Sequence, residues 1–275
     1  MIPDLRPFLE EDVGAGDITT QVFVPDIVGT ATIICEQDAV IAGLEEAQRI
    51  FELLGVDTRP LCIDGDRVVA GTIIMLISGP LKGIMTGERV ALNFLMRMSG
   101  ISTATNNIVR IVRLKDPCLK VAATRKTTPG FRFFEKKAVT LGGGWPHRYC
   151  LDDMVLIKDN HIVACGGIRE AMDRAGSVPD GIKIEIEVQT IWDGITAAEC
   201  GADIILADHM SPTKTKELRD AVKQISPKTE IEASGNITPD MVPDYAGCAD
   251  IVSLGSLTHS VKAMHFSLDI DEKKH

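Results

Sequence analysis

From about Cys118 onward, short runs rich in β-branched residues alternate with amphipathic segments of helical length. Strands that alternate with helices in this way form βαβ units and a parallel sheet. The spacing is even and no Gly-x-Gly-x-x-Gly sequence follows a first strand, which favours a barrel over a doubly wound fold. Six units are two short of a closed eight-stranded barrel, so we expect an open, incomplete α/β barrel. The expected strands are 118–124, 154–158, 183–188, 203–208, 230–234 and 250–256.

The residues before this region predict an α+β N-terminal domain, 1–112. Two segments, 30–43 and 67–80, read as strands with turn residues, and 45–55 reads as a helix between them. Residues 86–114 form a long helical region with an expected break near Gly100, after which Ser102, Thr103 and Thr105 would cap a new helix. We expect the barrel domain to span 113–259. The closing segment 260–275 is expected to be helical and to pack on the first domain.

The composition excludes several classes of partner. A net charge of −10 and a pI near 5.1 argue against nucleic acid and against an anionic membrane surface. No apolar run is long enough to cross a bilayer. Seven cysteines are dispersed without a Cys-x-x-Cys pair, and the N-terminus lacks the pattern of a secretory signal. We therefore expect reduced thiols and a cytoplasmic protein.

A basic segment stands out against this acidic background. Residues 119–148 contain seven Lys or Arg and one acidic residue, Glu135. Such a local excess of positive charge indicates a small polyanionic ligand. A solvated helix face accounts for Arg132, Lys136 and Lys137, but not for the basic pairs at 125–126 and 147–148, which sit at a strand end and after a Gly-Gly-Gly turn.

In α/β barrels the active site lies at the carboxyl ends of the strands. All six predicted strand ends are polar or glycine-rich, and the first four are charged. An unpaired charge that faces the interior costs several kcal/mol, so these groups must pair with one another, a metal or a ligand. The residues at the strand ends are Arg125 and Lys126, then Lys158, Asp159, Asn160 and His161, then Glu187, then Asp208 and His209, then Ser234, Gly235 and Asn236, and finally Gly255 and Ser256.

The charged residues among these fall into two chemical kinds. Guanidinium groups match carboxylate or phosphate oxygens in a bidentate fork. Glu187 and Asp208 could act as acid and base or hold a hard cation; nearby positive charge favours the second role, with Mg²⁺ as the cation. The small residues at 234–236 and 255–256 suit a phosphate held by main-chain N–H groups. The cationic donors are Arg125, Lys126, His147, Arg148 and Lys158.

Other polar residues are less informative. Glu185 lies two residues before Glu187 on the same strand, so both point to the same face; it either contacts substrate or pairs with a neighbour. His161, His209 and His259 are more typical of structural histidines than of catalytic bases.

Nine segments together resemble the quinolinate phosphoribosyltransferase family over nearly the whole chain. They are EDVGAGDITT, GERVALNFLMRMSGIST, ATRKTTPGFR, GGGWPHR, LIKDNH, EIEV, ADIILADHM, EASGNI and SLGSLTHS. The resemblance implies an α/β N-terminal domain with an open α/β barrel. It also implies an activity that joins quinolinate to phosphoribosyl pyrophosphate with Mg²⁺, giving nicotinate mononucleotide, pyrophosphate and CO₂.

The same resemblance implies roles for individual residues. Arg125, His147, Arg148 and Lys126 would bind the quinolinate carboxylates, with Thr124 beside them. Lys126 and Lys158 would meet phosphates, while Glu187 and Asp208 would bind ribose hydroxyls and Mg²⁺. The loops at 234–236 and 255–256 would take the 5′-phosphate. Arg89 would reach the site of a neighbouring subunit, which implies at least a homodimer.

The chain departs from the family pattern at positions that flank these residues. Trp145 and Pro146 precede His147 where a polar residue is common, Cys150 stands where glycine is frequent, and His209 stands where asparagine is usual. Two alternatives stay open: a related enzyme with another acceptor, and a non-catalytic sensor of quinolinate or nucleotide.

Overall fold

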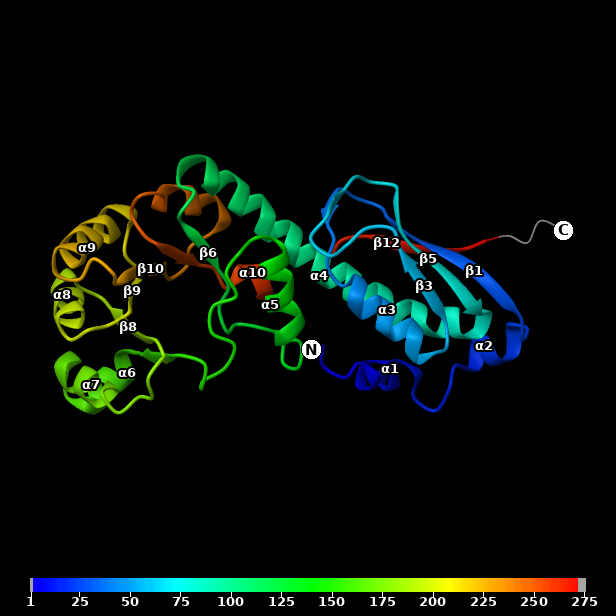
Figure 1. The fold of residues 1–275 in the computed structure, drawn as a ribbon, viewed down its shortest axis with the longest axis horizontal. Helices are drawn as coiled ribbons and strands as arrows, with labels where there is room; N and C mark the ends of the chain where they lie inside the picture. Colours follow the sequence, from blue (N-terminus) through cyan, green and yellow to red (C-terminus); the bar gives the residue numbers. More distant parts are fainter. Residues whose placement is uncertain (1, 272–275) are drawn as a thin grey trace. The chain divides into compact units, whose positions relative to one another are not determined.

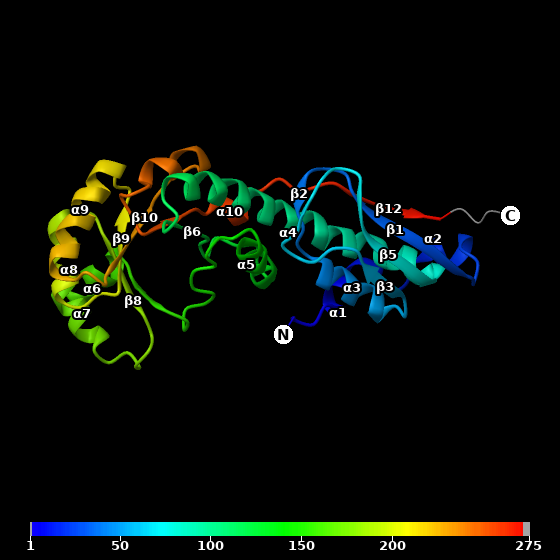
Figure 2. The same cartoon turned by 45° about the horizontal axis from the view of Figure 1, so that its top comes forward.

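The computed structural model describes residues 2–271 and divides them into two compact units. The first unit takes in the described parts of Met1–Asn106, Phe133–Gly143 and Val261–His275. The second takes in Asn107–Arg132 and Gly144–Ser260. The predicted boundaries at 112 and 259 give each domain one main segment, whereas here the segment Phe133–Gly143 also belongs to the first unit. Figures 1 and 2 show the chain from two directions.

The first unit has the predicted α+β character. An antiparallel sheet has the strand order β12-β1-β5-β3, formed by Phe266–Ile270, Val28–Cys35, Thr72–Pro80 and Asp57–Pro60. A short ribbon pairs β2 (Ala39–Val40) with β4 (Arg67–Val68). The helices are α1 (Arg6–Val13), α2 (Ile18–Phe23), α3 (Leu44–Leu53) and the first part of α4 (Leu81–Lys115).

The expected break of the long helix near Gly100 is wrong, because α4 is continuous from Leu81 to Lys115. Gly100 has a packing role instead: a Cβ there would lie 2.5 Å from the main-chain oxygen of Lys262. Ser102 and Thr103 do not cap a helix either. The Ser102 hydroxyl donates to the main-chain oxygen of Val40, and the main-chain N–H of Val40 donates to Thr103 Oγ1. These polar groups fasten the helix to the β2 segment.

The closing segment is a strand where a helix was expected. After α10 (Ser256–His259) the chain runs into β12, which pairs antiparallel with β1 from Phe266–Cys35 to Ile270–Ala31. Its residues group with the first unit. The alternation in the burial of Phe266–Ile270 is weak, and only Phe266 is buried, so the segment gives little strand pattern by itself. Residues 272–275 lie outside the described part of the chain.

Helix α5 (Arg132–Leu141) belongs almost entirely to the first unit, although it was assigned to the barrel domain. Two interactions explain this. Phe134 packs edge-on against Phe8 and Phe94, with ring centroids 5.7 and 5.0 Å apart. Lys137 Nζ lies 2.8 Å from Glu46, whose side chain is fully buried, and 2.6 Å from Glu45. An aromatic contact and a buried charge pair therefore hold this helix.

The second unit has the predicted open barrel. Its six parallel strands have the order β6-β11-β10-β9-β8-β7, and β6 and β7 at the two edges do not pair with each other. Each strand falls within a predicted one; their bounds are Lys120–Ala122, Ile251–Ser253, Glu230–Ser234, Ile204–Asp208, Ile184–Val188 and Val155–Ile157. The sheet is thus an incomplete barrel.

Helices cover one face of this sheet, as both views show (Figures 1 and 2). They are α6 (Asp159–Cys165), α7 (Ile168–Ala175), α8 (Ile191–Glu199) and α9 (Pro212–Ile225). Their aliphatic residues form a continuous core with the strands, which includes Met172, Ile186, Ile205 and Leu218. The segment between β10 and β11 is a 3₁₀ helix, Pro239–Tyr245, because Pro243 lies inside it and cannot donate a helical hydrogen bond. No helix within residues 2–271 has the length and apolarity that a membrane span needs.

Candidate active site

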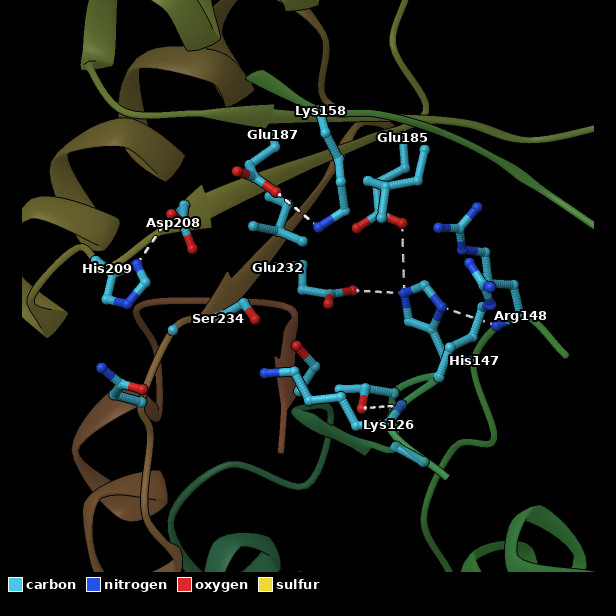
Figure 3. Close-up of a pocket in the computed structure, with 18 residues that line it drawn as sticks. Lys126, His147, Arg148, Lys158, Glu185, Glu187, Asp208, His209, Glu232 and Ser234 are labelled. Atoms are coloured by element: carbon cyan, nitrogen blue, oxygen red, sulfur yellow. Dashed lines mark hydrogen bonds and ion pairs between the residues drawn. The ribbon is translucent and has the colours of Figure 1, made fainter. Parts of the chain in front are cut away.

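A cavity of about 520 Å³ opens at the carboxyl ends of the strands in the second unit. Most of the predicted site residues line it together (Figure 3). From the predicted set, the lining contains Thr124, Arg125, Lys126, His147, Arg148, Lys158, Glu187, Asp208, Ser234, Gly235 and Asn236. The parallel sheet brings these residues together because all its strands end at the same edge. Their individual roles remain predictions.

The cationic side of the cavity consists of Arg125, Lys126 and Arg148. Nε of Arg125 is buried and has no hydrogen-bond partner within the described residues. Arg148 donates from Nη1 to the main-chain oxygen of Met154, 3.1 Å away. Burial, and then the charge of Arg125, lower the pKa of Arg148. The two guanidinium groups repel each other, and one of them has an unused donor. This side of the cavity therefore favours the binding of an anion.

Lys126 is held by its main chain. Its N–H donates to Thr124 Oγ1, and its main-chain oxygen accepts from Thr258 Oγ1 at 2.7 Å. Gly255 does not line the cavity, but a Cβ at this position would lie 2.9 Å from Cδ of Lys126 and 2.9 Å from Nε2 of His259. Gly255 thus makes room for the Lys126 side chain. Ser256 also lies outside the lining, and its buried hydroxyl has no hydrogen-bond partner in the described part of the chain.

The acidic side consists of Glu187 and Asp208, at the ends of the neighbouring strands β8 and β9. Glu187 Oε2 lies 3.3 Å from Lys158 Nζ, and Asp208 Oδ2 lies 2.9 Å from His209 Nδ1. Within residues 2–271, the other oxygen of each carboxylate has no hydrogen bond or ion pair. Free carboxylate oxygens on adjacent strand ends suit a hard cation that is also held by ligand phosphates. His161 makes a local contact at the start of α6: its Nδ1 accepts the main-chain N–H of Lys158.

Among residues 2–271, three residues other than glycine have left-handed main-chain conformations, and all three line the cavity. They are His147, His209 and Asn236, with φ of 55°, 54° and 53°. In an extended chain, successive side chains point to opposite sides. At each of these positions the turn instead brings two consecutive residues to the cavity. Because this conformation is unfavourable for residues with a Cβ, its clustering marks a functional region.

Behind the cationic side lies a buried group that sequence reasoning only partly found. Nε2 of His147 lies 3.0 Å from Glu232 Oε2 and 3.4 Å from Glu185 Oε2 (Figure 3). Glu185 is 0% exposed and Glu232 is 2% exposed. Glu232 was missed, although it precedes Ser234 by two residues on β10 and so points to the same face. This spacing repeats that of Glu185 and Glu187 on β8, which was a usable signal.

The electrostatics of this group are dominated by burial and by close charges. Burial, then the charge of Glu232, raise the pKa of Glu185 to about 7. Burial lowers the pKa of His147, while the nearby carboxylates of Glu185 and Glu232 act in the opposite direction and raise it. The main-chain N–H of Arg148 opposes that rise, because it donates to Nδ1 of His147 at 2.8 Å. The ring orientation described here is therefore that of the tautomer with hydrogen on Nε2.

Arg89 belongs to the first unit and is not among the residues that line this cavity. It is on α4 in the first unit, where it lines a separate hollow of about 340 Å³ together with Asp17 and Thr86. Asp17 accepts the hydroxyl hydrogen of Thr86 and the main-chain N–H of Thr20, so the EDVGAGDITT segment is ordered beside Arg89.

Comparisons with known proteins agree with this geometry. The model of the quinolinate phosphoribosyl transferase C-terminal domain matches residues 101–269, and that of the N-terminal domain matches residues 17–99. A probable carboxylating nicotinate-nucleotide pyrophosphorylase from Archaeoglobus fulgidus is 40% identical over 258 residues, 93% of this chain and 98% of the relative. The human carboxylating nicotinate-nucleotide pyrophosphorylase is 37% identical over 246 residues, 89% of this chain and 83% of the relative.

A solved structure supports the same relationship. The crystal structure of NadC from Streptococcus pyogenes has a TM-score of 0.91 and 36% sequence identity, and the match covers 98% of this chain and 96% of that one. Both family models, which together account for most of the sequence, and relatives of more than 30% identity across nearly their full length lead to one conclusion: the chain belongs to the quinolinate phosphoribosyl transferase family.

Proposed function

We propose that the chain is a carboxylating nicotinate-nucleotide pyrophosphorylase of the cytoplasm. The reaction transfers a phosphoribosyl group from phosphoribosyl pyrophosphate to quinolinate and releases pyrophosphate and CO₂, a step of NAD biosynthesis. The single observation that supports it most is the pairing of Arg125 and Arg148 in one cavity with Glu187 and Asp208. The cationic side would bind a dicarboxylate, and the acidic side would bind a sugar pyrophosphate that carries a magnesium ion.

The dicarboxylate site rests on unsatisfied positive charge. Arg125 has a buried Nε without a partner, and its charge lowers the pKa of Arg148. A ligand carboxylate between the two groups would relieve this repulsion and accept a charge-assisted hydrogen bond. Lys126, which lies in the space left by Gly255, would contact the second carboxylate or a phosphate. The three cations would hold the pyridine ring with its nitrogen towards the acidic side.

Glu187 and Asp208 would hold Mg²⁺ chiefly through the ligand's phosphates and ribose hydroxyls. Bound there, the cation would neutralise charge on the leaving pyrophosphate. Lys158, 3.3 Å from Glu187, would add positive charge beside it. Ser234, Gly235 and Asn236 would bind the 5′-phosphate. Gly235 has φ of 98°, and a Cβ at this position would lie 2.7 Å from the His209 ring, so a larger residue would not fit there.

The chemical steps need no covalent bond to the protein. Pyrophosphate leaves C1 of the ribose, and the pyridine nitrogen forms the new bond to that carbon. The ring then bears a positive charge, so it can accept the electron pair of the C2–carboxylate bond as CO₂ departs. A proton then replaces the lost carboxylate. Positioning and electrostatic stabilisation supply the rate enhancement.

Arg89 enters the proposal as a residue for a neighbouring subunit's cavity, in a homodimer or a larger assembly of dimers. Its support is its place in the GER segment, which the family resemblance assigns to the site of a neighbouring subunit. Sedimentation would measure the assembly. Mixing Arg89→Ala with Arg125→Ala protein would then test sharing, because hybrid dimers should regain one intact site.

The activity is tested by incubating the purified protein with quinolinate, phosphoribosyl pyrophosphate and Mg²⁺, and measuring mononucleotide and CO₂ in equal amounts. Nicotinate and other pyridine acids serve as alternative acceptors. We expect turnover with quinolinate, dependent on Mg²⁺ and reduced at least about 100-fold in Asp208→Asn, since one charged contact is worth about 1.5–3 kcal/mol and two are lost. Turnover with another acceptor alone, or ligand binding without turnover, would replace the proposal.

A further inference from the structure

Glu232 is a buried carboxylate that faces the cavity yet is shielded from solvent. It lies on β10, is 2% exposed, and accepts a hydrogen bond from Nε2 of His147 at 3.0 Å. Burial of a carboxylate is unfavourable unless it receives a hydrogen bond. The His147 ring supplies that hydrogen bond, so the two side chains fix each other.

The opposite edge of the His147 ring is also engaged by the protein. The main-chain N–H of Arg148 donates to Nδ1 at 2.8 Å (Figure 3). Both ring nitrogens therefore have protein partners, and the ring forms a brace between the β10 strand and the main chain at Arg148.

The brace acts where the main chain is in an unfavourable conformation. His147 has φ of 55°, which an L-residue with a Cβ rarely adopts. This turn allows the side chains of both His147 and Arg148 to line the cavity. Without an interaction that favours it, the chain would relax towards an extended conformation, and Arg148 would turn away from the cavity.

We propose that Glu232 is a positioning residue for Arg148: through the His147 ring it holds the left-handed turn that points the Arg148 guanidinium at the substrate carboxylate. The proposal rests on the proposed function in naming that carboxylate. It assigns Arg125 and Arg148 to direct binding of that carboxylate and adds a bracing role for His147.

The same three side chains could be mistaken for a metal centre. One ligand atom each from His147, Glu185 and Glu232 lies within 4.8 Å of the others. However, Nδ1 of His147 accepts a hydrogen bond, so in the neutral ring the hydrogen sits on Nε2. A nitrogen that bears a hydrogen cannot bind a metal. The geometry therefore favours a hydrogen-bonded brace.

The test compares Glu232→Ala and Glu232→Gln with Glu230→Ala as the matched control. Glu230 lies on the same strand but pairs with Lys120 and Lys183 outside the cavity. We expect Glu232→Ala to raise KM for quinolinate about tenfold, the effect of about one misplaced charged hydrogen bond. KM for phosphoribosyl pyrophosphate should stay within about twofold. The glutamine oxygen can still accept from Nε2, so Glu232→Gln should stay within about threefold in both constants, as should the control.

A second measurement is independent of activity and of the alanine variant's folding. Nitrogen-15 spectra of histidine side chains distinguish the Nε2–H tautomer from the Nδ1–H tautomer and from imidazolium. We expect His147 of the wild-type and Glu232→Gln proteins to show the Nε2–H form, protected from exchange. An Nδ1–H form, an imidazolium, an unprotected ring N–H, or equal changes in both substrates' KM in Glu232→Ala would overturn the proposal.

These readouts separate two kinds of failure. A wild-type protein with no turnover would remove the proposed function, while the spectra would still decide whether Glu232 holds the His147 ring. An active wild-type protein whose KM for quinolinate is unchanged in a folded Glu232→Ala variant would remove only the positioning role.

Discussion

Replacement of Arg125 by alanine tests the cationic side of the cavity most directly. Its buried Nε has no hydrogen-bond partner within residues 2–271, so this donor is available to a ligand. If a bidentate pair with a substrate carboxylate supplies two charged hydrogen bonds, each worth about 1.5–3 kcal/mol, their loss costs at least about 3–4 kcal/mol. That is a fall in kcat/KM for quinolinate of roughly 150- to 900-fold.

The fold should not suffer from the same change. Arg125 lowers the pKa of Arg148, which means that the two charges repel each other in the ligand-free protein. Removing one of them should leave the urea midpoint equal to that of the wild type or slightly higher. Arg125→Lys keeps a charge but not the fork, so its kcat/KM should fall between those of the wild type and Arg125→Ala.

The assay is steady-state release of CO₂ from quinolinate, with urea unfolding in parallel. Arg169→Ala is the control, because Arg169 lies on α7 of the same unit, pairs with Glu199 at the surface, and has 59% of its side chain exposed. A kcat/KM for Arg125→Ala within about threefold of the wild type would refute the reasoning. An equal loss in Arg169→Ala would show that the effect is not specific to the cavity.

Two further predictions concern buried charge and pH. Lys137→Met should lower the free energy of unfolding by about 3–5 kcal/mol at pH 7, because it leaves the fully buried Glu46 unpaired. Burial already raises the pKa of Glu46, so Glu46 in the folded variant should take up a proton on acidification. The loss in free energy of unfolding should therefore be smaller at pH 5 than at pH 7. Equal losses at the two pH values in urea unfolding would contradict this. For Glu185, the pKa rises from 4.5 to about 7 on folding, so its effect on stability is most favourable below 4.5 and is lost as pH rises through 7. Glu185→Gln should therefore gain stability over the wild type on going from pH 5 to pH 8, by up to about 3 kcal/mol, and a flat difference in denaturation curves over that range would be evidence against the shift.

Much of the barrel could be read from the sequence because its information is local. Each run such as 203–208 is apolar enough to be buried, and each intervening helix has one apolar face, so the order of elements follows from periodicity. Parallel strands then bring all their polar ends to one edge. That rule alone was sufficient to place Arg125, Lys158, Glu187 and Asp208 in a single cavity.

The errors have physical causes that local patterns do not contain. Gly100 was read as a helix break, yet it is a site of close approach to Lys262. Phe266–Ile270 forms a strand because β1 offers an unpaired edge, not because its own residues alternate strongly. Helix α5 lies with the first unit because Phe134 and Lys137 find partners there that are distant in the sequence.

The sequence alone determined the fold class, the chain of βα units and the charged residues of the cavity, since each depends on residue type, periodicity and order. Only the tertiary structure decided that Glu232 and Glu185 converge on His147, and that the left-handed turn at 147 directs Arg148 to the cavity. Those features depend on how close β8 and β10 lie to the loop that carries His147, which is 85 residues from Glu232 in the sequence. A contact of that kind is fixed by packing, which no local pattern encodes.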